Sequence, residues 1–202
     1  ARDPRLAQEA GWEGAISFPR ELQLGSDGSL EITPAQELEK ALRGKNHHWE
    51  SFLLKATDRD SFENIKSDSA EIAVTFKPGA DGSFESERFG IVVRQSNDGR
   101  EQTRIYYEPG TGELVMDRSN SSLSSMVQKD QQRGRLSLAA HESLNLRVFL
   151  DRSVVEVYAN KRVAGTLRIY PTLEDSRHID LFTEGSDVNV ESADIWEFPI
   201  KY

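Results

Sequence analysis

The sequence contains no cysteine among its 202 residues. This excludes disulfide bonds, thiol nucleophiles and cysteine-ligated metals, although a chain of this length can bury a core without crosslinks. It leaves the compartment open, because secreted domains of this size also fold without bridges. Basic residues are outnumbered, since 25 Lys and Arg stand against 34 Asp and Glu for a net charge of -9. This balance argues against nucleic acid and anionic membranes as partners, whereas neutral sugars are not repelled.

Long apolar runs are absent as well. No stretch approaches the roughly 20 apolar residues that a membrane-spanning helix needs. The first residues, ARDPRLAQEAGWEG, do not have the pattern of a signal peptide. We therefore expect no membrane partner.

Helical patterns are rare, and the best one lies in ITPAQELEKALRG, residues 32–44. We expect Thr33 to cap the start of a short helix, Leu38 and Leu42 to share one face, and Gly44 to end it. The preceding residues 12–24 alternate apolar and polar positions and predict an extended segment. This part of the chain therefore predicts one strand and one short helix.

Most of the sequence after Asn46 alternates in the manner of β-strands. Turn sequences such as KPGADGS, SNDGR and EPGTG separate the segments. Many short strands at fairly regular spacing with little helix indicate an all-β fold, an antiparallel β-sandwich of jelly-roll or concanavalin-like type. The predicted strands are SFLLKAT, EIAVTF, FGIVVRQ, TRIYYE, ELVMDR, LNLRVFL, SVVEVYA, RVAGTLRIYP, HIDLFTEG and NVESADIWEF.

One predicted hairpin, LRVFLDRSVVEVYANKR at residues 146–162, carries a glutamate within an otherwise apolar second strand. Strand alternation places Glu156 on the face opposite the core, together with Tyr158. There Glu156 is solvated, paired with Arg147 across the strands, or placed at a partner surface. A solvated or paired residue is the simplest interpretation.

Three segments in order carry a resemblance to a known family. Residues 11–22 read GWEGAISFPREL, residues 37–43 read ELEKALR, and residues 146–171 contain the hairpin followed by TLRIYPT. This order resembles the C-terminal part of glycoside hydrolase family 32, the invertases, inulinases and levanases. The resemblance implies that residues 1–44 are the remnant of the last blade of a catalytic propeller plus a linker helix, and that residues 45–202 are a C-terminal β-sandwich.

The resemblance also implies where the catalytic residues are. Family members use an aspartate in an N-D-P-N-G motif, one in an R-D-P motif and a glutamate in an E-C motif, all on the propeller. Such enzymes need two suitably separated carboxylates. This chain contains neither N-D-P-N-G nor E-C, and its Arg2-Asp3-Pro4 lies too close to Trp12 to be the family motif. We therefore expect no catalytic residue here.

Four residues remain as candidates for a place next to substrate. Trp12 lies in the segment that resembles the closing blade, whereas Arg147, Glu156 and Tyr158 have the polar and aromatic chemistry of a sugar site. The four histidines are scattered without a paired carboxylate at metal spacing, so we expect no metal site and no cofactor. In the resemblance, Asp151 and Glu156 are structural parts of the hairpin.

Three functions therefore remain open. The first is the non-catalytic C-terminal portion of a β-fructofuranosidase, which stabilises the propeller or contributes to a homodimer or to contact with sucrose or fructan. The second is a stand-alone fructan-binding module. The third is a purely structural sandwich whose uncovered apolar face invites association. The sequon at Asn120 and the resemblance together predict a secreted protein, with Asn120 as a glycosylation candidate.

Overall fold

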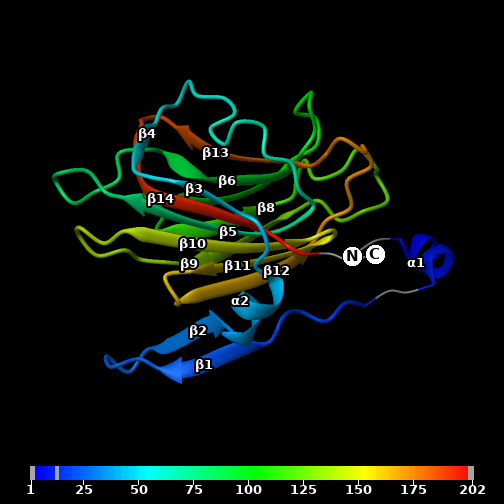
Figure 1. The fold of residues 1–202 in the computed structure, drawn as a ribbon, viewed down its shortest axis with the longest axis horizontal. Helices are drawn as coiled ribbons and strands as arrows, with labels where there is room; N and C mark the ends of the chain where they lie inside the picture. Colours follow the sequence, from blue (N-terminus) through cyan, green and yellow to red (C-terminus); the bar gives the residue numbers. More distant parts are fainter. Residues whose placement is uncertain (1–2, 12–13, 200–202) are drawn as a thin grey trace.

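The computed structural model describes residues 3–11 and 14–199. Two antiparallel sheets face each other in a sandwich, and a separate two-stranded hairpin with a short helix lies beside one of them (Figure 1). The predicted all-β antiparallel sandwich is confirmed. No helix in the described ranges is long and apolar enough to cross a membrane.

The larger sheet has seven strands and is antiparallel throughout. Its order is β12-β11-β10-β5-β14-β3, and β4 pairs with another part of β14. Its strands are β3 (Asn46–Trp49), β4 (Phe52–Leu54), β5 (Ser69–Lys77), β10 (Leu144–Asp151), β11 (Val154–Ala159), β12 (Val163–Arg168) and β14 (Val188–Glu197).

The smaller sheet has five strands in the order β13-β6-β7-β8-β9. Its strands are β6 (Arg88–Gln95), β7 (Thr103–Glu108), β8 (Glu113–Asp117), β9 (Gln131–Arg135) and β13 (His178–Glu184). Consecutive strands β6 to β9 lie side by side, so this sheet is built largely from local connections.

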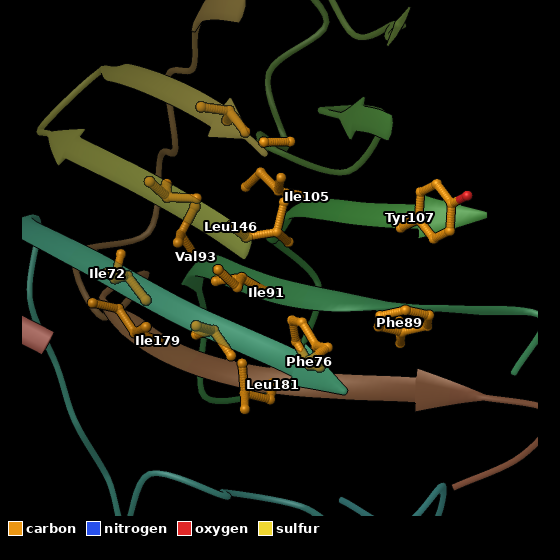
Figure 2. Packing of buried hydrophobic residues seen from close by; sticks show 14 of the residues in the cluster. Ile72, Phe76, Phe89, Ile91, Val93, Ile105, Tyr107, Leu146, Ile179 and Leu181 are labelled. Atoms are coloured by element: carbon orange, nitrogen blue, oxygen red, sulfur yellow. The ribbon is translucent and has the colours of Figure 1, made fainter. Parts of the chain in front are cut away.

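The core lies between the two sheets and follows the alternation of the strands. Ile72 and Phe76 of β5 point toward Phe89 and Ile91 of β6 and toward Leu181 of β13 (Figure 2). These residues are buried. Because every second residue of β5 and β6 points inward, the alternate residues are left on the outer faces of the sandwich.

Three loops at one end of the sandwich are tied together by Glu101, which is fully buried. Its carboxylate accepts backbone hydrogen bonds from Leu123 (2.8 Å), Thr172 (2.8 Å) and Leu173 (2.9 Å) and side-chain bonds from Thr172 and Ser176 (both 2.7 Å). Burial alone would raise the pKa of Glu101, but these hydrogen bonds lower it to about 2. Glu101 is therefore a buried anion held by its hydrogen-bond donors.

The segment before the sandwich contains two short helices and one hairpin. They are α1 (Pro4–Ala10), β1 (Arg20–Leu24), β2 (Leu30–Pro34) and α2 (Glu37–Leu42). In Figure 1, α2 lies between the β1–β2 hairpin and the edge of the sandwich formed by β10, β11 and β12, and α1 projects beyond the end of the sandwich. The β1–β2 hairpin is a sheet of its own.

The start of the predicted linker helix was wrong by three residues. Thr33 does not cap it, because Thr33 and Pro34 pair with β1 as the end of strand β2. The helix begins at Glu37, and its N-cap Gln36 makes no side-chain capping bond. Leu38 is buried as expected. Cross-strand pairing with residues 20–24 outweighed the local capping signal.

Candidate docking site on the outer face of the seven-stranded sheet

Four large side chains form a row across the outer face of the seven-stranded sheet. Glu156 on β11 pairs with Phe149 on β10, Phe149 pairs with Glu71 on β5, and Glu71 pairs with Trp196 on β14. Glu71 and Glu156 are only 0% and 1% exposed. A carboxylate so deeply buried needs hydrogen bonds or a counter-charge, because water cannot reach it. The residues that cover this face must supply them.

Glu156 receives its hydrogen bonds from the segment that precedes the sandwich. The backbone N–H of Phe18 donates to Oε1 at 2.6 Å, and an Nη of Arg20 lies 3.4 Å from Oε2. The same nitrogen of Arg20 donates to Thr166 Oγ1 at 2.5 Å, and its guanidinium lies 5.5 Å from the ring centre of Tyr158. Burial, followed by the negative charge of Glu156, raises the pKa of the Tyr158 hydroxyl.

Glu71 is held by two arginines. Arg43 donates from Nε at 2.9 Å and from Nη2 at 2.8 Å, and Arg147 donates from Nε at 2.5 Å. Arg147 also reaches Glu39 of α2 at 3.0 Å. The guanidinium of Arg43 lies 3.8 Å from the ring centre of Trp196, and its hydrogen bond to Glu71 raises its pKa.

An aromatic contact lies between the two carboxylates. The ring of Phe18 meets the ring of Phe149 edge to face with 5.6 Å between centres, and it contacts Phe198 at 6.4 Å. Edge-to-face aromatic pairs add about 0.5–1.5 kcal/mol beyond the area that they bury. Phe18 therefore fills the space between the two buried anions with apolar surface.

We call Phe18, Arg20, Glu39 and Arg43 the linker clamp. Each of its two arginines contacts one buried glutamate of the sheet, and its phenylalanine lies between the two glutamates. This arrangement explains how two carboxylates can be buried on the outer face of a sheet. The segment before the sandwich covers them and donates hydrogen bonds to them. The site binds a piece of polypeptide, and in the described ranges it does not present a pair of carboxylates to a substrate.

The expected environments of Glu156 and Arg147 were wrong in two respects. Glu156 is not solvated, and it does not pair with Arg147, because the two-residue turn at Arg152 and Ser153 sets Glu156 opposite Phe149. Arg147 lies opposite Tyr158 instead. The third alternative placed Glu156 at a partner surface; in the structure a segment of the same chain covers it.

The expected proximity of these residues to a substrate stays a prediction. Arg147 and Tyr158 are neighbours and Tyr158 is buried beneath Arg20, whereas Trp12 lies outside the described residues. Asn120 lies exposed in a turn, in keeping with its expected accessibility, whereas Ser122 of the same sequon is buried. Its glycosylation also stays a prediction.

Sequence reasoning did not identify Glu71, Arg43 or Phe18 as site residues. The sequence of this strand could have indicated Glu71. Alternation in EIAVTF places Ile72 and every second residue after it in the core, which leaves Glu71 on the outer face. No short-range pattern indicated that Arg43, 28 residues away in sequence, would reach it. The site depends on how the linker folds back over the sheet.

Comparison with known proteins agrees with this architecture. The family model described as the C-terminal domain of glycosyl hydrolases family 32 matches residues 37–197. An insoluble β-fructofuranosidase isoenzyme of Arabidopsis thaliana is 29% identical over 92% of this chain and 38% of its own length. A levanase of Bacillus subtilis is 27% identical over 91% of this chain and 27% of its own length.

Solved structures show the same fold. Fructan 1-exohydrolase IIa of Cichorium intybus, in complex with 1-kestose, superposes with a TM-score of 0.85 at 21% identity. The match covers 98% of this chain and 43% of that one. The chain thus spans less than half the length of the relatives that it matches. Because the family model covers most of its residues, the chain belongs to the C-terminal domain family of glycosyl hydrolases family 32.

Proposed function

We propose that this chain is the C-terminal part of a β-fructofuranosidase that hydrolyses sucrose or a fructan, and that it supplies no catalytic carboxylate itself. In this proposal residues 1–44 complete the catalytic propeller and lead into the linker, and residues 45–202 are the sandwich that holds them. The names of the relatives, which include invertases and a levanase, support the substrate class. Cell-wall and insoluble isoenzymes among them support an extracellular location.

The observation that carries the proposal is the pair of buried glutamates. Glu71 and Glu156 belong to the sandwich, but Arg43 and Arg20 come from the segment that we assign to the linker and the propeller edge. Buried charges are tolerated when they are paired and hydrogen-bonded, and each is strongly destabilising when its partner leaves. The sheet is thus built to retain residues 18–43, which suits a domain that stabilises the catalytic domain.

The β1–β2 hairpin gives independent support. A two-stranded sheet is marginally stable alone, and in the described part of the chain β1 pairs with β2 only. Leu22, Leu24 and Leu30 of this hairpin are 63%, 80% and 55% exposed, and Ile16 before it is 97% exposed. Leu24 and Leu30 pair across the hairpin, and exposed apolar side chains that lie together mark a surface that another part of a protein covers. We assign that cover to the catalytic domain.

Replacing Leu24 with serine is expected to separate docking from folding. Leu24 is 80% exposed, so the unfolding free energy of the 202-residue chain should change by no more than about 0.5 kcal/mol. In the longer protein, the same change should lower the thermal midpoint by several degrees, because it removes a contact with the catalytic domain. Leu53→Ser, at an exposed leucine of strand β4 on the side of the sandwich away from the hairpin (Figure 1), is the matched control and should leave both proteins unchanged.

The proposal is tested on the longer protein. A reading frame that continues upstream of Ala1 and encodes the three hydrolase motifs supports it, as does fructose release by the purified product. A start codon immediately before Ala1, or equal effects of Leu24→Ser and Leu53→Ser in the longer protein, contradicts it.

A further inference from the structure

A cavity of about 420 Å³ lies between the β2 strand and the outer face of the seven-stranded sheet. Ile32, Thr33 and Pro34 line it from the β2 side, and Ala73 and Thr75 line it from β5. Ala73 lies beside Arg147 and Asp194 in the sheet, and its small side chain leaves room where its neighbours are long. Binding sites for small molecules commonly enclose about 300–1,000 Å³. The cavity is therefore large enough for a sugar unit.

Polar groups with unused hydrogen-bonding capacity line this cavity. Across the described ranges, Arg147 bonds through Nε and Nη2, and its Nη1 makes no hydrogen bond and is not among the buried unpaired atoms. Asn145 accepts from Thr75 Oγ1 at 3.0 Å through Oδ1, which leaves its amide N–H groups available in an exposed side chain. The hydroxyl of Thr75 donates to Asn145, so its oxygen can still accept.

The charges around the cavity are already balanced. Its three charged lining residues are Arg147, Glu142 and Lys161. Because each of these residues already has a partner of opposite charge, a charged ligand would find no unpaired counter-charge among them. The electrostatics therefore favour a neutral ligand. The partners are Glu71 and Glu39 for Arg147, Arg162 for Glu142, and Glu31 for Lys161.

We propose that this cavity binds a neutral sugar unit, with Arg147 and Asn145 donating to hydroxyl groups, Thr75 accepting from one, and Pro34 and Ala73 forming an apolar wall. Adjacent hydroxyls need this combination of directed donors and acceptors beside an apolar surface for the C–H groups. The assignment of the unit as fructosyl rests on the proposed function. Residues of β2 and of the sandwich form the cavity within this chain, so binding requires no further catalytic domain.

The test is calorimetric titration of the intact 202-residue chain with fructose, sucrose and a short inulin. We expect saturable binding at a one-to-one ratio, with Kd in the range of about 1–10 mM. Ala73→Leu, which fills the cavity, and Asn145→Ala, which removes a donor, should each weaken binding at least about tenfold. The matched control is Asn189→Ala, because Asn189 is an exposed asparagine on the same sheet outside this cavity, and it should bind as the unchanged chain does.

Thermal unfolding of each variant shows whether it is folded. If Ala73→Leu disturbs the sheet, the binding test depends on Asn145→Ala instead. No binding of any sugar up to about 50 mM overturns the proposal. Full binding by folded Ala73→Leu and Asn145→Ala overturns it as well, because the sugar then lies elsewhere. Glucose binding as tightly as fructose overturns the fructosyl assignment. None of these results depends on hydrolysis by the longer protein, so failure here and failure of the proposed function are distinguishable.

Discussion

Replacing Glu71 with alanine is expected to destabilise the chain by about 3–5 kcal/mol. The change removes the buried carboxylate to which Arg43 and Arg147 both donate and leaves them only the partly exposed Glu39 as a shared acceptor. It also opens a gap beneath the linker clamp. We further expect the linker to loosen, so that amide hydrogens of α2 and of the β1–β2 hairpin exchange faster than those of the sandwich core. Denaturant unfolding and hydrogen exchange measure the two effects.

Glu39→Ala is the matched control for Glu71→Ala. Glu39 contacts the same two arginines, but its side chain is 41% exposed. Partly exposed ion pairs contribute about 0–1 kcal/mol, so its loss should have a small effect. Equal stabilities for the Glu71 and Glu39 variants would show that burial of the Glu71 carboxylate is not what holds the linker.

Replacing Glu101 with glutamine is expected to cost about 2–4 kcal/mol. Glutamine keeps the size of the side chain, but it loses the charge and turns one oxygen into an N–H donor. That donor would face groups that themselves donate, namely Ser176 and the backbone of Thr172 and Leu173. The loops around residues 123 and 172 should then lose protection from exchange together. The control is Glu174→Gln, the same substitution at an exposed glutamate of the loop around residue 172.

The contribution of Glu101 to the free energy of unfolding should depend on pH. Its pKa is about 2 in the folded chain against an ordinary value of 4.5. A carboxyl group with a lowered folded pKa contributes stability above its unfolded pKa and loses it as the pH falls toward the folded one. The stability difference between the unchanged chain and Glu101→Gln should therefore be full at pH 7 and shrink between about pH 4.5 and pH 2. A difference that stays constant across that range would contradict the assignment.

Much of the fold could be predicted because strand alternation encodes it. Leu146, Val148 and Leu150 alternate in β10, and all three are buried in the core as expected. Strand β9 was not predicted, because its sequence QQRGR has no apolar residue and pairs at the edge of its sheet through backbone groups. Strand β3, with the sequence NHHW, was missed for a related reason. Edge strands bury little, so their sequences carry little signal.

The candidate site was less accessible to prediction. Alternation placed Glu156 on the outer face of its strand, which is where it lies. Nothing in the hairpin sequence shows that Phe18 and Arg20 come back to cover that face from more than 130 positions away. Contacts at such separation depend on the path of the linker, and the usual expectation for an outward glutamate is exposure to water. The family resemblance is confirmed over residues 37–197, and the structure supplies the contacts between this part and the segment before it.

The most direct test of the proposed function is fructose release from sucrose, inulin and levan by the purified 202-residue chain, measured beside the longer protein that includes the upstream sequence. We expect no release by the chain above a buffer blank, and clear release by the longer protein. Sustained release by the mass-verified chain alone would contradict it. Asp3, Asp151 and Glu156 would then be the first residues to replace.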